Sequence, residues 1–520
     1  MLVHLTPQDT AVASLGLTAA FVFALPHEGA AAVGEELLKD IEGAVGRVVD
    51  KWRMLQGRMV KLEEPDIWAI EVPSPASSAH AGAIFTSARI ATAYPTAAGT
   101  PSLPLTPFSP SGTPAFLPTP NLSHFRHFSA PSTLSALATS SRPLLAAHAT
   151  LFTDALALGL SLPHGAFDAT GMGMVVDALN AELNGREWEA PSWPSQESGG
   201  ADNPLAAAVD GLLSAQDAES PAPATGADLL PVLPGWTAPA AASIARLMSS
   251  LAAETFWHKS SAQWVFLPQE KVEALVRGVK KEVVELSGGK EWVSSGDVLT
   301  AWVLKAAHSS DASSTSSVAA SAVLNYRPFL PIPLTSSPSS STTAPPSFAS
   351  YPHNAHLFYP LFLAPVALSA LSSSSLASLA LAHRRTLERV KQPAYIAAAL
   401  AATERGRKAL VPERDWPFGV REEERVHRWI LTNQASTSIG RLSLSFPLPP
   451  LATDRPSAAP EGGARQPLPL VAFYVLTSPA PPLGLMDQSI AFQSVQGGVI
   501  LAGTMREARW EGVKRAVEAL

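Results

Sequence analysis

The pattern of apolar and polar positions predicts both helices and strands along this chain. Apolar residues recur at helical spacing over 35–52 and again over 268–286, so each range is predicted to be an amphipathic helix. Short runs rich in apolar and β-branched residues predict strands at 18–25, 66–72, 144–152, 155–162, 317–326 and 495–503. Helices alternate with strands in both halves of the chain, which is typical of α/β proteins built from layered domains.

The predicted strand at 155–162 has two different faces. Leucines at every second position alternate with Ala157, Gly159 and Ser161, so one face is large and apolar while the other is small. The small face can accept a closely packed neighbour. Pro163 ends the strand because it has no N–H to donate, and a helix is predicted to begin near Ala169.

Proline- and serine-rich segments divide the chain into two predicted halves. We expect an N-terminal half at 1–188, a Pro/Ala-rich crossover linker at 189–240 and a C-terminal half at 241–520. Two further low-complexity stretches, near 334–347 and 451–466, are predicted to be mobile surface insertions in the C-terminal half. A chain of 520 residues exceeds the size at which one core keeps growing, which favours two core-bearing units.

Composition excludes several classes of function. A net charge of −7 and a pI near 6.0 argue against a nucleic-acid-binding face. The chain has no cysteine, so it has no disulfide, no thiolate nucleophile and no Cys-based zinc site, and we expect no metal. Its N-terminus has no secretory pattern and its longest apolar runs are too short to span a bilayer. We therefore expect a cytoplasmic, monomeric protein without a membrane span.

His164 and Asp168 stand in the loop between the predicted strand and helix. Asp168 directly precedes the helix, so it could simply be the N-cap that accepts from a main-chain N–H. His164 could be a structural histidine with its hydrogen bonds satisfied. The pattern His-x-x-x-Asp alone occurs by chance in many proteins, so the surrounding sequence has to decide.

That surrounding sequence resembles the BAHD acyltransferases and their fungal relatives of the trichothecene 3-O-acetyltransferase type. The run "PLLAAHATLFTDALALGLSLPHGAFDATGMGMVVDALNAEL" is similar to the family's core strands, its His-x-x-x-Asp motif and its following helix. Other family segments resemble stretches that occur here in the same order: "VHLTPQDT", "VVDKWRMLQGRMVKL", "VSSGDVLTAWVLKAAH", "NYRPFLPIPL" and "YPHNAHL". Two departures stand out, because Ala169 replaces the usual glycine and no Asp-Phe-Gly-Trp-Gly motif follows the strand at 431–450.

The resemblance implies a fold of two similar chloramphenicol-acetyltransferase-like α/β sandwich domains, with an active-site channel where they meet. It implies a CoA-dependent acyltransferase that moves an acyl group from acyl-CoA, with acetyl-CoA as the expected donor, to a hydroxyl or amine of a small molecule. Acyl-CoA would be a co-substrate, and no permanently bound cofactor is expected. Two alternatives stay open: a condensation-type enzyme that takes its thioester from a carrier protein, and a non-catalytic protein that binds a metabolite.

The chemistry assigns candidate roles to a few residues. A neutral imidazole can remove a proton from an attacking hydroxyl at neutral pH, so His164 is the candidate general base. No covalent intermediate is expected, since the chain lacks both cysteine and a G-x-S-x-G serine elbow. The resemblance implies that Asp168 supports the loop by pairing with Arg327, although Arg327 could be an ordinary surface strand residue. Candidate donors to the oxyanion are Thr432, Asn433, Ser436 and Ser438.

Asp297 is expected to be a helix N-cap, and Trp257, Trp264 and Trp302 could line an acceptor pocket, although tryptophans in such positions belong to the core more often.

Overall fold

The computed structural model places two large sheets, their helices and several smaller elements. The described residues are 1–6, 9–10, 13–26, 30–62, 68–73, 84–94, 106–131, 133–191, 203, 205, 208–211, 259–311, 314–330, 348–362, 365–400, 426–447, 465–478 and 489–520. The expected insertion at 334–347 and Trp257 lie outside the described residues, as does 451–464 of the second expected insertion.

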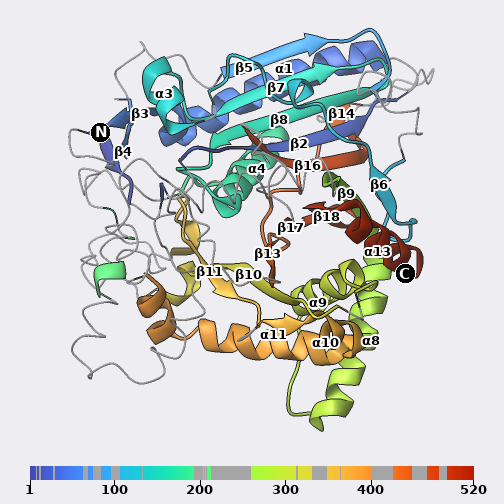
Figure 1. The fold of residues 1–520 in the computed structure, drawn as a ribbon. Coiled ribbons are helices and arrows are strands. Elements are labelled where there is room, and N and C mark those ends of the chain that lie inside the picture. Colours follow the sequence, from blue (N-terminus) through green and yellow to red (C-terminus); the bar gives the residue numbers. More distant parts are fainter. Residues whose placement is uncertain are drawn as a thin grey trace.

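The first sheet has five strands in the order β16-β2-β8-β7-β5. Their bounds are β2 (Gly16–Ala24), β5 (Ile84–Arg89), β7 (Ala146–Leu151), β8 (Ala155–Pro163) and β16 (Leu470–Ser478). All neighbours are antiparallel except β5 and β7, which are parallel. Two helices, α1 (Ala30–Lys51) and α4 (Ala169–Leu183), pack on this sheet and on each other (Figure 1).

The second sheet follows the order β11-β10-β13-β17-β18-β9-β6, with β12 also paired to β10. Its strands are β6 (Ala115–Leu117), β9 (Ser261–Pro268), β10 (Ser317–Asn325), β11 (His356–Pro360), β12 (Val366–Ala367), β13 (Val426–Asn433), β17 (Ser489–Val495) and β18 (Gly498–Met505). Its helices, which pack beside this sheet in Figure 1, are α8 (Gln269–Ser287), α9 (Ser295–Ala307), α10 (Leu368–Ser373), α11 (Leu376–Val390) and α13 (Glu507–Glu518).

The smaller elements complete the described chain. A three-stranded sheet contains β1 (Leu2–His4), β4 (Trp68–Glu71) and β3 (Arg58–Lys61), and a hairpin-like pair contains β14 (Ser445–Pro447) and β15 (Arg465–Pro467). The remaining helical elements are α3 (Leu134–Ser140) and the 3-10 turns η1 (Arg53–Gln56), η2 (Leu122–His124), η3 (Arg327–Phe329) and η4 (Phe348–Ser350).

The two sheets exchange strands along the sequence. β6 precedes the expected linker yet pairs with β9 of the second sheet, whereas β16 follows it yet pairs with β2 of the first. Within the expected 189–240 linker, the described residues Asn203 and Leu205 are buried. The two predicted halves are therefore tied together by strand pairing across the expected linker, and the described residues Asn203 and Leu205 are buried with them.

Most predicted elements correspond to observed ones with shifted ends. The helix predicted over 35–52 begins earlier, at Ala30, and the one predicted over 268–286 runs over Gln269–Ser287. The single strand predicted at 495–503 is wrong at its start, since Val495 ends β17 and a turn at Gly497 leads into β18. Gly497 has φ +83°, which a glycine adopts without strain, so the turn closes an antiparallel pair.

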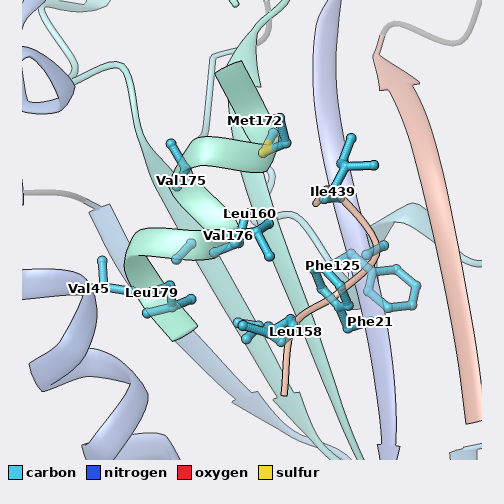
Figure 2. Close-up of a cluster of buried hydrophobic side chains, with 14 of the residues drawn as sticks. Phe21, Val45, Phe125, Leu158, Leu160, Met172, Val175, Val176, Leu179 and Ile439 are labelled. Carbon is cyan, nitrogen blue, oxygen red and sulfur yellow. The ribbon is translucent and has the colours of Figure 1, made fainter. Parts of the chain in front are cut away.

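The two faces of β8 pack as their side chains suggest. Figure 2 shows Leu158 and Leu160 directed toward Val176 and Leu179 of α4. These four side chains belong to the first hydrophobic core. On the other face, a Cβ at Gly159 would overlap the carbonyl oxygen of Phe125. The small face of β8 therefore accepts the close approach of another main chain, while its large face packs against α4.

Candidate functional site

His164 follows β8 directly and is held through its own main chain. Its N–H donates to the carbonyl of Leu15 at 2.9 Å, and its Nδ1 lies 3.0 Å from the carbonyl oxygen of Phe167. A carbonyl oxygen can only accept, so Nδ1 carries the proton and Nε2 keeps its lone pair. The residue is partly exposed. Burial of the ring lowers the pKa of His164 below its ordinary value, so the imidazole is neutral at pH 7.

Asp168 is the helix N-cap that its sequence position allowed and also the partner of Arg327 that the resemblance implied. Its Oδ1 accepts from the main-chain N–H groups of Thr170 and Gly171 at 3.0 and 3.1 Å, so it is the N-cap of α4. The same Oδ1 accepts from one Nη of Arg327 at 3.0 Å, and Oδ2 forms an ion pair with the other Nη at 2.9 Å. Burial alone would raise the pKa of Asp168, but the Arg327 guanidinium outweighs it and holds that pKa below its usual 3.8.

Arg327 lies in η3, just after β10, and is 2% exposed. The alternative of an ordinary surface strand residue is therefore wrong. Its Nε donates to the carbonyl of Tyr351 at 2.9 Å, and one Nη also donates to the carbonyl of His353. The planar, five-donor guanidinium suits this arrangement, because it serves a carboxylate and two carbonyls at once.

A turn from the second half of the chain, residues 351–355, forms hydrogen bonds with the loop that contains His164 and Asp168. His353 Nδ1 lies 2.7 Å from the carbonyl of Ala166, and Asn354 Nδ2 donates to the carbonyl of His164 at 2.7 Å. The N–H of Ala355 lies 3.4 Å from Asp168 Oδ2. The turn also packs tightly on α4, since a Cβ at Gly171 would overlap the carbonyl oxygen of Pro352.

A buried carboxyl group, that of Asp9, contacts this turn through Tyr351. Asp9 is fully buried, and its carboxylate accepts from the N–H and Oγ1 of Thr6 at 2.6 and 2.8 Å. The hydroxyl of Tyr351 donates to it at 3.0 Å and Asn203 Nδ2 at 3.2 Å. Burial raises the pKa of Asp9 to about 7, against the lowering effect of Thr6, Tyr351 and Arg327. This one buried group is thus contacted from three distant parts of the chain, by Thr6, Asn203 and Tyr351.

A second imidazole, His356, lies in the electrostatic neighbourhood of His164 and Asp168. It begins β11 and is partly exposed. Burial lowers the pKa of His356 to about 4, with the charge of Asp168 acting in the opposite direction. Both histidines are therefore neutral at pH 7, and neither adds a positive charge beside the other.

The four candidate oxyanion donors lie at the end of β13 and in the turn after it. Thr432 and Asn433 end the strand, and the Oδ1 of exposed Asn433 accepts from the N–H of Ala435 at 3.0 Å. Ser436 and Ser438 belong to the turn, whose main chain at Ser438 packs against Gly173 of α4. The turn is thus beside the helix that Asp168 caps. These contacts do not include His164, so the oxyanion role stays a prediction.

The other residues considered from the sequence have structural positions. Asp297 is not an N-cap: Ser294 caps α9, and Asp297 completes a capping box from the third helical position. Trp302 is buried in the second core and Trp264 packs against Tyr474. Among the described residues, no group of His, Asp and Glu could hold a metal ion. None of the helices described is both long and apolar enough to cross a bilayer.

Sequence reasoning assigned no role to Asp9, Tyr351 or Asn354, or to His353 and His356. All five lie in the segments "VHLTPQDT" and "YPHNAHL", which the resemblance had already singled out. Asp9 and Asn354 are 345 positions apart, so no local pattern could show that they meet. The available signal was that both polar segments matched the same family.

Comparisons with known proteins find similar acyltransferases and similar solved structures. No family model matches the chain. An O-acyltransferase of Aspergillus ustus, pboC, is 31% identical over 160 residues, which cover 31% of this chain and 30% of that protein. The O-acetyltransferase PaAT-2 of Phomopsis amygdali is 26% identical over 215 residues, or 38% of each chain. The matched segments thus span about a third of the length of these curated relatives.

Solved structures extend the similarity to nearly the whole chain. TRI101 of F. sporotrichioides, solved with coenzyme A and T-2, has a TM-score of 0.57 at 12% identity and covers 99% of this chain and 97% of its own. Vinorine synthase has a TM-score of 0.51 at 10% identity, covering 98% of this chain and 91% of its own. The chain therefore has the two-domain, chloramphenicol-acetyltransferase-like fold of these structures. Over about a third of its length it is also similar in sequence to two O-acyltransferases.

Proposed function

We propose that this protein is an acyltransferase that moves an acyl group from acyl-CoA to a hydroxyl group of a small molecule, with His164 as general base. The observation that carries the proposal is the hydrogen bond between His164 Nδ1 and the carbonyl of Phe167, which leaves Nε2 unprotonated on a partly exposed residue. The lowered pKa of His164 keeps the ring neutral at pH 7. A base in this state accepts a proton without first having to lose one.

The reaction needs one base and no covalent intermediate. Nε2 takes the proton from the acceptor hydroxyl while its oxygen attacks the thioester carbonyl carbon, and a tetrahedral oxyanion forms. Collapse of the oxyanion breaks the carbon–sulfur bond. The leaving thiolate takes the proton from Nε2, so free CoA departs as a thiol and His164 is again neutral. Thr432, Asn433, Ser436 and Ser438 are the proposed sources of donors to the oxyanion.

Asp168 and Arg327 hold the site together in this proposal. Arg327 and the main-chain N–H groups of Thr170 and Gly171 surround the Asp168 carboxylate, and the pKa of this group is lowered, so it is a poor acceptor for a reacting proton. Arg327 belongs to the second half of the chain and Asp168 to the first, so their ion pair sets the distance between the two halves. We assign both residues a supporting role.

The choice of donor and acceptor follows the similar proteins. TRI101 was solved with coenzyme A, which supports acyl-CoA as donor, and we take acetyl-CoA as the first donor to test. Both curated relatives are named O-acyl or O-acetyl transferases, which favours a hydroxyl over an amine. Among the described residues, no contact favours the carrier-protein or the non-catalytic alternative.

The experiment is a mass-spectrometric screen. Purified protein is incubated with a metabolite extract in four parallel samples. Each sample also contains one donor: acetyl-, propionyl-, butyryl- or hexanoyl-CoA. We expect a product heavier than its acceptor by the mass of the acyl group added and released CoA thiol in equal amount. Treatment of the product with alkaline hydroxylamine then distinguishes the two linkages, because an ester is cleaved whereas an amide is stable. No mass gain with any donor, although the protein binds a metabolite, would favour the non-catalytic alternative.

A further inference from the structure

The position of the His164 ring depends on main-chain atoms of its own loop. Nδ1 is fixed by the carbonyl of Phe167, so the place of Nε2 is set by the loop conformation between residues 164 and 167. Two carbonyls of that loop are held from outside, that of His164 by Asn354 and that of Ala166 by His353. The catalytic geometry is therefore imposed by the 351–355 turn.

Asn354 uses both hydrogens of its side-chain amide for this purpose. One goes to the carbonyl of His164 at 2.7 Å and the other to the carbonyl of Asp9. Asn354 is fully buried, so each of these hydrogen bonds replaces one that water would otherwise supply. One side chain thus fixes the main chain of His164 relative to that of Asp9.

Asp9 is itself anchored firmly enough to serve as a reference point. Thr6 closes a local turn onto its carboxylate, and the Tyr351 hydroxyl joins the carboxylate to the turn that carries Asn354. Asn203 adds a donor from the crossover segment and also donates to the carbonyl of His4. A buried carboxyl with this many donors loses several of them if it moves, so displacement is costly.

We infer that Asn354, Asp9 and Tyr351 are positioning residues that fix Nε2 of His164 for proton transfer. This inference rests on the proposed function of His164. The three residues touch no reacting atom, and they act by keeping the carbonyl of His164 at one place. A displacement of about 1 Å at a reacting group can cost about 10²-fold in rate, so loosening this network should lower turnover rather than substrate binding.

The test compares Asn354→Ala with a matched control, Asn180→Ala. Asn180 is also a buried asparagine, and it too joins distant parts of the chain: its Nδ2 donates to the carbonyl of Arg441 at 2.9 Å and its Oδ1 accepts from Ser443 N–H at 2.8 Å. Each substitution removes two hydrogen bonds made by a buried asparagine side chain. We expect similar falls in melting temperature, but only Asn354→Ala should lower kcat, by about 10- to 100-fold with the KM for acyl-CoA within about twofold.

Tyr351→Phe provides a milder second variant in case Asn354→Ala folds poorly. It removes only the hydroxyl that contacts Asp9, and its control is Tyr359→Phe, which removes a buried hydroxyl that lies 3.0 Å from His383 Nε2. We expect Tyr351→Phe to lower kcat several-fold and Tyr359→Phe to leave it unchanged per folded molecule.

The outcomes separate this inference from the proposed function. If His164→Ala is inactive while Asn354→Ala and Tyr351→Phe match the kcat of their controls, the positioning network is refuted and the general base stands. If His164→Ala keeps wild-type turnover, both ideas fail. A fall in kcat confined to Asn354→Ala and Tyr351→Phe, at unchanged KM, supports the inference.

Discussion

Two buried aspartates at helix N-termini, Asp168 and Asp297, show how similar local chemistry can have different consequences. Each is in ion-pair contact with a buried arginine, Asp168 with Arg327 at 2.9 Å and Asp297 with Arg384 at 3.0 Å. Folding lowers the pKa of both carboxyls below 3.8, because their partners outweigh the effect of burial. Local pairing alone does not distinguish a site from a scaffold.

The difference lies in what each pair connects. Asp297 joins α9 to α11 within the second half of the chain, and its other neighbour, His383, also lies on α11. The Asp168 and Arg327 pair joins the two halves at the loop that presents His164. A buried ion pair between two distant parts of the chain helps to fix the loop in which it lies. The loop that contains Asp168 also contains His164, the candidate general base.

The comparison is tested most strongly by the same substitution at the two arginines. Arg327→Met leaves the buried Asp168 carboxylate without its cation, so it should lower the free energy of unfolding by about 3–5 kcal/mol. Arg384→Met removes one of the two basic neighbours of Asp297 and leaves His383 in place, so its effect on the free energy of unfolding should be smaller. Thermal unfolding and turnover, both normalised to folded protein, are the measurements. We expect turnover to fall at least tenfold in Arg327→Met only. An equal loss of turnover in Arg384→Met would mean that the two regions are not functionally distinct.

Substitutions at two glycines test the same difference between the two regions with a smaller expected loss of stability. A Cβ would overlap the carbonyl oxygen of Pro352 at Gly171 and that of Ala306 at Gly512. Overpacking of this kind costs about 1–3 kcal/mol, so Gly171→Ala and Gly512→Ala should both lower the melting temperature. Gly171→Ala displaces α4 from the 351–355 turn, so kcat should fall as well. Unchanged kcat in Gly171→Ala would show that the turn does not control the site.

The pH dependence of stability gives the smallest effect. The pKa of Asp168 is lowered in the folded state, so its contribution is present above pH 3.8 and is lost as pH falls through the folded pKa. Without Arg327, burial should raise that pKa, and the variant should lose stability as pH rises above 4. The stability gap between wild type and Arg327→Met should therefore widen from pH 4 to pH 7 in urea unfolding. A gap that does not change with pH would contradict the ion-pair assignment.

Local parts of the site were predictable because they depend on neighbours in sequence. The alternation ending at Leu162, the break at Pro163 and the cap at Asp168 follow from backbone chemistry over a dozen residues. Arg327 was reached only through the family resemblance, since 159 positions separate it from Asp168. Its location after β10 gives no local sign that it is buried.

The missed parts depend on tertiary contacts. Asn354 and Asp9 meet because the second half of the chain folds back on the N-terminal turn, and the exchange of β6 and β16 has the same long-range origin. Asp297 was assigned the wrong position in its helix because a serine three residues earlier competes for the cap.

The central claim is that His164 Nε2 accepts the proton in acyl transfer, and turnover of His164→Ala per folded molecule tests it most directly. Melting temperature and CoA binding, measured on the same sample, report the folded fraction and the donor site. We expect both to stay near wild type while turnover falls about 10²- to 10⁴-fold, the usual contribution of a positioned base. Wild-type turnover per folded molecule in His164→Ala would contradict the mechanism.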